Sequence, residues 1–310
     1  MPRVLLGGMK KVLVTGGAGF IGSNLVDALI EKGWNVVVVD NLERGKRENV
    51  HPEAEFHRVD IRDLENMAPL FPGVDYVFHL AALPRVQPSI QEPVRYHDVN
   101  VNGTLNVLVA ARDAGVKKVV FSSSSSVYGE QEYFPTHEEL PLAPMHPYAL
   151  HKHIGELHAR QFSQLYELPT VSLRYFNVYG KRQVLEGAYA LVLGIFVRQR
   201  LAGEPLTIVG DGEQRRDFTS VIDVINANIL AAENEKVISG DVFNIGSGRN
   251  YSINEIAQVI GGPTVSLPPR IEAKLSLADN TKARKVLGWA PTVDLLQWLK
   301  EHKKEVGIED

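Results

Sequence analysis

The feature that most constrains the fold of this chain is the alternation of short apolar runs with longer amphipathic stretches over residues 1–180. The runs are rich in β-branched residues and almost continuously apolar, which is typical of parallel strands covered on both faces. They lie at 11–15, 36–40, 55–60, 76–80, 118–123 and 170–175, with helical periodicity between them at 20–32, 94–114 and 148–166. Repeated strand–helix units of this kind predict an α/β fold with a doubly wound, Rossmann-type parallel sheet.

The character of the sequence changes after about residue 180. Segments become shorter and loops contain more Gly and Pro, and helical patterns recur at 190–202, 222–233, 253–260 and 280–287. A chain of 310 residues with 44% apolar composition can bury one large core and a smaller one. We therefore expect a large domain over residues 1–180 and a smaller C-terminal α/β domain over residues 181–310, some of whose segments are interleaved with the first.

Composition excludes several classes of function. The formal net charge is −4 and no stretch concentrates Lys and Arg, so we expect no nucleic-acid or membrane partner. The absence of cysteine excludes disulfides, thiolate zinc sites and thiol nucleophiles, and the spacing of the 10 histidines predicts no metal site. The apolar runs fall short of the ~18 residues that cross a bilayer. Because Met1–Met9 is too short and polar for a secretory signal, we expect a cytoplasmic protein.

A glycine-rich turn follows the first expected strand and opens the first expected helix. Its glycines are Gly16, Gly19 and Gly22. Glycine permits a tight turn and a close approach of the backbone, so a pyrophosphate can sit at the helix N-terminus. A glycine triplet alone is a weak signal, but the strand before it and the helix after it are the context that dinucleotide binding requires.

Acidic residues at the ends of the next two expected strands indicate which dinucleotide binds. Asp40 can accept hydrogen bonds from both ribose hydroxyls, and its charge would repel a 2′-phosphate, so NAD is favoured over NADP. The alternative is that Asp40 is an ordinary turn residue at a strand end. Asp60 and Ile61 could flank the adenine, or could belong to an ordinary loop.

A tyrosine and a lysine at i and i+4, Tyr148 and Lys152, follow a run of serines that contains Ser124. Residues at this spacing share one face of a helix. An ammonium near a phenol stabilises the phenolate, so we expect the pKa of Tyr148 to lie below its usual value of about 10. A phenol tuned in this way is a general base at physiological pH, and the order of turn, serine, tyrosine and lysine makes this set a catalytic hypothesis.

Several short motifs strengthen the hypothesis because they recur along the chain in one order. They are TGGAGFIGS (15–23), VVDN (38–41), HLAA (79–82), SSSSSVYG (122–129), PYALHK (147–152), LRYFNVYG (173–180), GDGEQRRDF (210–218), FNIGSG (243–248) and LADNTKARKVLGW (277–289). Together they resemble the extended short-chain dehydrogenase/reductase family and, within it, the NAD-dependent nucleotide-sugar epimerases. The likeness covers the chain from Lys11 to about Pro291 and is greatest for UDP-hexose and UDP-N-acetylhexosamine 4-epimerases.

This resemblance implies a mechanism. Tyr148 would take the proton of the sugar 4-hydroxyl while C4 gives hydride to the nicotinamide of NAD. Ser124 would hydrogen-bond the same oxygen, and Lys152 would bind the nicotinamide ribose. The 4-keto sugar would then turn over and recover hydride on its other face, so that NAD is regenerated in each cycle. A homodimer with paired helices from 94–114 and 148–166 is also implied.

The resemblance implies further contacts with both ligands. Those with NAD are Phe20, Ile21, Asn41, Leu80, Ala81, Ala82, Asn100, Ser122 and Tyr175, besides the glycines, Asp40, Asp60, Ile61, Tyr148 and Lys152. Those with the UDP-sugar are Arg85, Ser124, Ser126, Asn177, Arg216, Arg270, Glu272 and Ser276. Some of these have structural alternatives: Asn100 as a solvent-facing helix residue, Tyr175 as a core residue and Arg216 as an ion-pair partner of Asp217.

The sequence departs from the family pattern at two places. Dehydratases of this superfamily carry Asp and Glu where this chain has Ser125 and Ser126, and serines cannot supply an acid and a base at neutral pH, which argues against a 4,6-dehydratase. Near the C-terminus, Glu272 falls in register with an acidic position of the family that contacts the uridine ribose. Arg270 is displaced by one residue, which leaves its expected pyrophosphate contact in doubt.

Two residues bear on the choice of sugar. Ser276 stands where epimerases restricted to plain hexoses carry a bulky tyrosine, so a small residue here favours N-acetylhexosamines or both kinds of sugar. Arg85 pulls the other way, because a guanidinium in the loop over the sugar could grip the carboxylate of a UDP-hexuronate. A UDP-glucuronate 4-epimerase is therefore the second hypothesis, and a redox-sensing NAD-binding protein without enzyme activity is the third.

Overall fold

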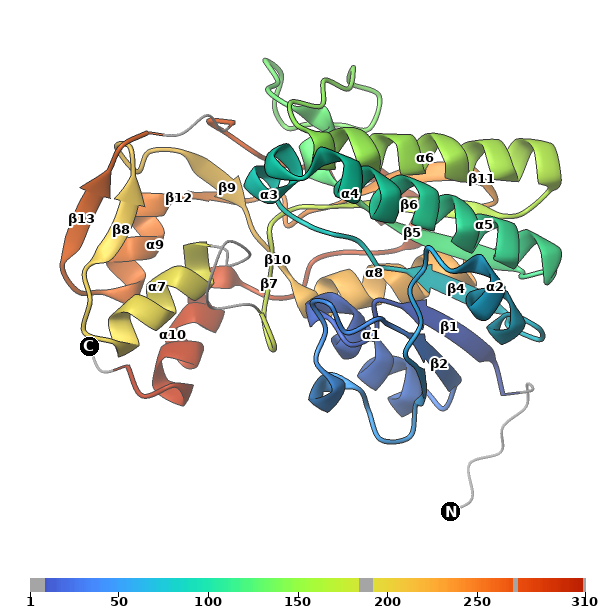
Figure 1. The fold of residues 1–310 in the computed structure, drawn as a ribbon. Helices are drawn as coiled ribbons and strands as arrows, with labels where there is room; N and C mark the ends of the chain where they lie inside the picture. The colour runs from blue at the N-terminus through green and yellow to red at the C-terminus, as the bar shows by residue number, and fades with distance from the viewer. Residues whose placement is uncertain (1–8, 184–191, 270–272, 309–310) are drawn as a thin grey trace.

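In the computed structural model, which describes residues 9–183, 192–269 and 273–308, a large parallel sheet carries helices on both faces and a smaller cap lies at one end (Figure 1). The sheet strands are β1 Lys11–Thr15, β2 Asn35–Val39, β3 Glu55–His57, β4 Tyr76–His79, β5 Lys118–Ser124, β6 Thr170–Tyr175 and β11 Ser239–Ile245. Their order is β11-β6-β5-β4-β1-β2-β3, and every pairing is parallel. This confirms the doubly wound α/β fold.

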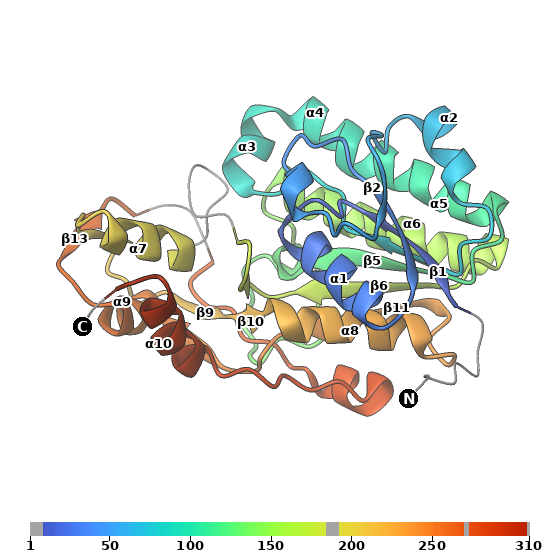
Figure 2. The ribbon, with the colours of Figure 1, turned by 90° about the horizontal axis from the view of Figure 1, so that it is seen from below.

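The sheet is buried on both faces because successive side chains of its strands point to opposite cores. Val12 and Val14 of β1 pack with the core beneath the sheet, whereas Leu13 packs with the core above it. Figure 2 shows α1 (Phe20–Glu31) and α8 (Val221–Glu233) covering the lower face. The upper face carries α2 (Leu64–Met67), α4 (Pro93–His97), α5 (Gly103–Asp113) and α6 (Pro147–Tyr166). Both faces being apolar explains the almost continuous apolar runs in the sequence.

The helix expected over 94–114 is interrupted. A turn of π-helix at Asp98–Asn102 separates α4 from α5, and a short helix α3 (Val86–Gln91) precedes them. Single π turns within α-helices are frequent at functional sites. Here the turn buries Asn100, so the alternative of a solvent-facing Asn100 is wrong.

The cap is built from α7 (Val192–Leu201), α9 (Ile253–Ile260) and α10 (Leu295–Glu305) with three pairs of short strands. These pairs are β7 (Val178–Tyr179) with β10 (Thr219–Ser220), β8 (Leu206–Val209) with β13 (Thr264–Leu267), and β9 (Arg215–Asp217) with β12 (Asn250–Ser252). The helix expected at 280–287 is a π turn at Ala283–Leu287. Residues 190 and 191, with which the expected helix over 190–202 begins, lie outside the described residues.

The chain returns from the cap to the large sheet. After leaving β6 it forms α7 and β8, then comes back as α8 and β11, which pairs with β6 along its length. Segments 221–233 and 239–245 therefore belong to the large layer, although they follow the boundary that we expect at residue 180. The division into domains 1–180 and 181–310 stays a prediction.

Candidate active site

The glycine turn between β1 and α1 can be formed only by glycine. Gly16 has a φ of +72°, and a Cβ on it would lie 2.7 Å from the backbone nitrogen of Ala81. A Cβ on Gly22 would lie 2.1 Å from the carbonyl oxygen of Gly16, which no neighbouring shift could accommodate cheaply. Helix α1 begins after Gly19 with no hydrogen bond from a capping side chain of the described residues. Its first N–H groups therefore fit a pyrophosphate.

Asp40 follows β2 at the edge of this turn. One carboxylate oxygen accepts from the backbone nitrogen of Ala18 at 3.0 Å, and the other accepts from that of Leu42 at 2.8 Å. Burial raises the pKa of Asp40, and these two hydrogen bonds oppose the rise. Each oxygen keeps acceptor capacity beyond its backbone bond. The carboxylate fits the two hydroxyls of the ribose of NAD.

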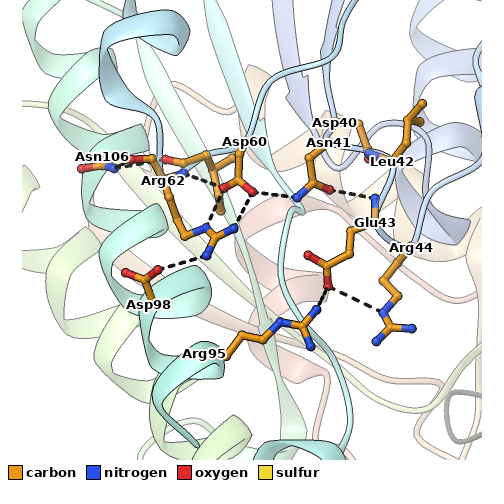
Figure 3. Close-up of polar contacts among 11 residues, drawn as sticks. Asp40, Asn41, Leu42, Glu43, Arg44, Asp60, Arg62, Arg95, Asp98 and Asn106 are labelled. Carbon is orange, nitrogen blue, oxygen red and sulfur yellow. Dashed lines mark hydrogen bonds and ion pairs between the residues drawn. The ribbon is translucent and has the colours of Figure 1, made fainter. Parts of the chain in front are cut away.

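Asp60, expected beside the adenine, is held by its neighbours (Figure 3). Its carboxylate accepts from Arg62 at 2.9 and 3.0 Å and from the side chain of Asn41 at 2.8 Å. Hydrogen bonds from Arg62 lower the pKa of Asp60 to about 2 despite partial burial. Arg62 also reaches Asp98 on the π turn at 3.1 Å. Asp60 thus holds together the loops at this end of the cavity, and the side chain of Asn41 is bonded to it.

Ser124, Tyr148 and Lys152 come together where β5 ends and α6 begins. Ser124 and Tyr148 both line the cavity, and the backbone nitrogen of Tyr148 donates to the hydroxyl of Ser89 at 3.2 Å. The ammonium of Lys152 donates to the carbonyl oxygen of Ser122 at 2.6 Å and lies 6.0 Å from the centre of the Tyr148 ring. Burial lowers the pKa of Lys152 to about 8, so its charged form predominates at neutral pH.

The expectation of a lowered pKa for Tyr148 is wrong for this arrangement. Burial raises the pKa of Tyr148, and the hydrogen bond from Ser124 and the charge of Arg85 oppose the rise only in part. The reason is geometric, because Lys152 points at a backbone carbonyl beneath the ring and not at the phenol oxygen. Ser124 and Arg85, rather than Lys152, are the protein groups that favour the phenolate.

Ser122 and Tyr175 form a layer behind these residues. The hydroxyls of Ser122 and Tyr175 are 3.0 Å apart, and the hydroxyl of Tyr175 meets the amide of Asn228 on α8. Burial raises the pKa of Tyr175 to about 12, so it stays neutral. Tyr175 is therefore part of the core and of the cavity wall at the same time.

A single cavity of about 1220 Å³ joins these groups between the sheet and the cap. Of the residues that the sequence predicts for the site, these line it: Gly16, Gly19, Phe20, Ile21, Gly22, Asp40, Asn41, Asp60, Ile61, Leu80, Ala81, Ala82, Arg85, Ser122, Ser124, Ser126, Tyr148, Lys152, Tyr175, Asn177, Arg216 and Ser276. Arg270 and Glu272 lie outside the described residues. These residues share one continuous space, and their contacts with ligands stay predictions.

Asn100 is not among the residues that line this cavity, and its expected contact with the cofactor stays a prediction. Its side chain accepts from the backbone nitrogen of Leu83 at 2.7 Å and donates to the carbonyl oxygen of Leu83 at 2.9 Å. The hydroxyl of Tyr96 donates to the carbonyl oxygen of Pro84 at 2.8 Å. Both side chains therefore fix the loop that leads to Arg85, whose φ of +91° is a strained backbone conformation for a residue with a Cβ.

At the cap end, Asn177 and Ser276 are engaged with the protein. The amide nitrogen of Asn177 donates to the carbonyl oxygen of Asp217 at 2.8 Å and to the hydroxyl of Ser276 at 3.3 Å. The same hydroxyl accepts from the backbone nitrogen of Asp217 at 3.1 Å. Arg216 donates to the carbonyl oxygens of Arg215 and Lys274. Before Asn177 could donate to a phosphate, it would have to release one of these bonds.

Other cavity residues were missed by the sequence reasoning because they carry no chemical signature. The segment between β5 and α6 contributes Gln131, Phe134, Thr136, Met145 and His146, and the cap contributes Val192, Ile195, Phe196, Thr207, Val209, Phe218 and Leu267. Most are apolar or small and lie in loops or short elements. Glu43, Arg44 and Lys46 after β2 are charged exceptions, and His146, directly before Pro147-Tyr148, caps α6 through Ala149.

The fold and the cavity define a dinucleotide-dependent α/β enzyme whose cavity lies at the carboxyl ends of a parallel sheet. In the part of the chain that the structure describes, no helix is long and apolar enough to span a bilayer. Residues 12–246 match the model of the NAD dependent epimerase/dehydratase family. The chain belongs to this family, and NAD is its cofactor.

Relatives match over nearly the whole chain. A putative UDP-glucose 4-epimerase of Methanocaldococcus jannaschii is 40% identical, covering 93% of this chain and 96% of the relative. A UDP-glucose 4-epimerase from Thermotoga maritima, solved with UDP-glucose, has a TM-score of 0.91 and 42% identity over 95% of this chain and 99% of its own. A UDP-N-acetylglucosamine 4-epimerase from Methanobrevibacter ruminantium, solved with UDP-N-acetylmuramic acid, has a TM-score of 0.89 and 39% identity over 96% and 97%.

Proposed function

We propose that this protein is a UDP-sugar 4-epimerase that keeps NAD bound through each catalytic cycle. The observation that carries the proposal is the single cavity that connects the glycine turn, Tyr148 and an end lined by the cap. An enzyme that only oxidised a small alcohol would not need the apolar cap end. Similarity to proteins named UDP-glucose and UDP-N-acetylglucosamine 4-epimerases supports the same reaction.

The residues of the site would divide the work as follows. NAD, when bound, supplies a hydride acceptor for sugar C4 and returns the hydride later. Tyr148 would take the proton of the 4-hydroxyl and give it back after the 4-keto sugar has turned over. Ser124 would share that proton, and Lys152 would hold the nicotinamide ribose. The glycine turn and Asp40 would hold the pyrophosphate and the adenosine ribose.

The proposed substrates are UDP-GlcNAc and UDP-GalNAc, with UDP-glucose and UDP-galactose also accepted. Ser276 supports this choice because it lines the cavity with a small side chain that is turned towards Asn177 and Asp217. A bulky residue at this position would intrude on the cavity. The N-acetyl group on C2 of an N-acetylhexosamine is bulkier than a hydroxyl, so it would clash first with such a residue.

Replacing Ser276 by Tyr is expected to lower kcat/KM for UDP-GlcNAc by about 10- to 200-fold, the range over which steric fit discriminates between substrates. Activity on UDP-glucose should change far less. Ser276→Ala is the matched control, because it removes the hydrogen bonds of the hydroxyl without adding volume. If both donors lose activity equally in Ser276→Tyr, or if Ser276→Ala behaves like Ser276→Tyr, the position does not select the sugar.

The experiment that tests the function is a proton NMR time course with UDP-GlcNAc, UDP-glucose and UDP-glucuronate in parallel, without added NAD. Appearance of the anomeric signal of UDP-GalNAc is the expected result. Conversion that requires added NAD would contradict retention of the cofactor. No conversion of any donor, even with NAD supplied, would overturn the UDP-sugar assignment.

Arg85 favours a second candidate, a UDP-glucuronate 4-epimerase. Its guanidinium lines the cavity and its charge acts on Tyr148, so a uronate carboxylate near the reacting carbon would meet a cation. A relative from Thermodesulfobacterium geofontis that is 34% identical is named UDP-glucuronate 4-epimerase. Conversion of UDP-glucuronate alone in the time course would establish this candidate in place of the first.

We also propose that the protein is a homodimer. Leu150, Leu157 and Leu165 recur at about two-turn intervals on α6 and are 46%, 49% and 64% exposed, and Val94 of the neighbouring α4 is 82% exposed. An apolar stripe of this kind on paired helices fits a second copy of the same surface. Sedimentation equilibrium should give the mass of a dimer, and Leu157→Glu should shift it towards the monomer. Wild-type protein that sediments as a monomer at micromolar concentration would contradict the proposal.

A further inference from the structure

Two ion pairs tie α4 and the π turn after it to loops at one end of the cavity (Figure 3). The guanidinium of Arg95 on α4 donates to the carboxylate of Glu43, in the loop after β2, at 2.6 Å. Three residues later, Asp98 on the π turn accepts from Arg62, in the loop after β3, at 3.1 Å. Two neighbouring loops are thus joined to one helical segment by opposite charges.

The pair of Glu43 and Arg95 lies at the edge of the cavity. Glu43 lines the cavity from the loop, and Val99, four residues after Arg95, lines it from the helical segment. The side chains of Glu43 and Arg95 are 25% and 39% exposed, so the pair lies between the cavity and the solvent. A second bond, of 2.5 Å to Glu92 on the same segment, holds the guanidinium of Arg95 in place. Arg95 is therefore ordered in advance for its contact with the loop.

The loop that carries Glu43 also carries the group that fits the adenosine ribose of NAD. That group is the carboxylate of Asp40, three residues before Glu43. The far end of the loop is anchored on the glycine turn, because the backbone nitrogen of Lys46 donates to the carbonyl oxygen of Ala18 at 3.0 Å. The loop is thus fixed to the turn near Lys46 and to α4 at Glu43.

We propose that Glu43 and Arg95 form a latch that keeps the loop after β2 closed against α4 and thereby slows the release of NAD. The inference deepens the retention of NAD in the proposed function, but it does not depend on the conversion of any sugar. Moving the loop away from α4 breaks a charge-assisted contact of 2.6 Å. A contact that must break before a ligand leaves acts mainly on the dissociation rate.

The experiment measures the dissociation rate of NAD from the holoprotein. Protein loaded with radiolabelled NAD is mixed with excess unlabelled NAD, and the label that stays bound is followed by rapid filtration. Arg95→Met and Glu43→Gln should each raise the rate about 2- to 5-fold, the effect of losing a partly exposed ion pair. Because both changes remove the same contact, the double variant should release NAD no faster than either single variant.

Lys117→Met is the matched control. Lys117 pairs with Asp75 at 2.7 Å and joins the segments that enter β5 and β4, at the edge of the sheet opposite the cavity. This variant should release NAD at the wild-type rate. Salt gives a second readout, because screening weakens an exposed ion pair. The ratio of the rates of Arg95→Met and the wild type should therefore shrink as sodium chloride is added.

An unchanged dissociation rate in Arg95→Met would overturn the proposal. It would also be overturned if the effects of Arg95→Met and Glu43→Gln multiplied in the double variant, since each side chain would then act on NAD by itself. An equal rise in Lys117→Met, or a ratio that salt does not change, would likewise refute an ionic latch. Wild-type protein that loses NAD during purification contradicts retention in the proposed function, but the rates of reloaded protein still decide the latch.

Discussion

Replacing Tyr148 by Phe is expected to lower kcat by about 10²- to 10⁴-fold, the range that general acid–base catalysis contributes. The substitution removes only the phenol oxygen and leaves the ring in place, stacked on that of His146. KM for the UDP-sugar and the content of bound NAD should therefore change little. Steady-state kinetics, together with the absorbance of NAD released from denatured protein, measures both effects.

Tyr133→Phe is the matched control, because Tyr133 is 69% exposed on the loop between β5 and α6. It should keep wild-type kinetics. If Tyr148→Phe keeps wild-type kcat, Tyr148 does not carry the proton. If this variant also keeps the full biological activity of the protein, the hypothesis of a redox-sensing NAD-binding protein would return.

Replacing Arg174 by Met is expected to cost about 3–5 kcal/mol of unfolding free energy, because it leaves one partner of a buried ion pair alone. Arg174 and Glu156 meet through two hydrogen bonds of 2.7 and 2.8 Å, and both side chains are only 4% exposed. Denaturant unfolding measures the loss. Arg198→Met, which breaks an exposed pair with Glu204, is the control and should cost less than about 1 kcal/mol. Equal losses in the two variants would contradict the argument.

The stabilising effect of this pair should depend on pH. Burial alone would raise the pKa of Glu156, but the hydrogen bonds from Arg174 and Ser123 and the charge of Arg174 outweigh it and lower the pKa to about 2. A carboxyl group with a depressed folded-state pKa stabilises the fold above its ordinary pKa of 4.5 and loses that contribution as the pH falls towards 2. The difference between the wild type and Arg174→Met should therefore be full at pH 7 and shrink below about pH 4.5.

The central strands could be predicted from sequence because both faces of each are buried. Val12 to Val14 and Val36 to Val39 are apolar at every position, and no other element of that length needs such a pattern. The glycine turn could be predicted for a related reason, because its local geometry excludes every other residue. Local requirements of this kind restrict the residue types at each position, so they can be recognised in the sequence.

Features that depend on distant segments could not be predicted in the same way. Strand β11 begins with the non-apolar residues Ser239-Gly240-Asp241, which do not look like a buried strand. It pairs with β6 only after the intervening chain has formed part of the cap. The π turn directs the amide of Asn100 to the backbone of Leu83, a contact that no local pattern in the sequence indicates. The pKa of Tyr148 moves opposite to the expectation because the spacing of Lys152 does not reveal which oxygen its ammonium will meet.

The return of the chain to pair β11 with β6 has a consequence for how this protein can be made. After β6 has emerged from the ribosome, α7, β8 and α8 must still be synthesised before β11, which pairs with β6, can emerge. Until then β6 is an unprotected edge, which invites pairing with other nascent chains. Fragments that stop near residue 180 should therefore be insoluble, and the two halves should associate productively only when synthesised together.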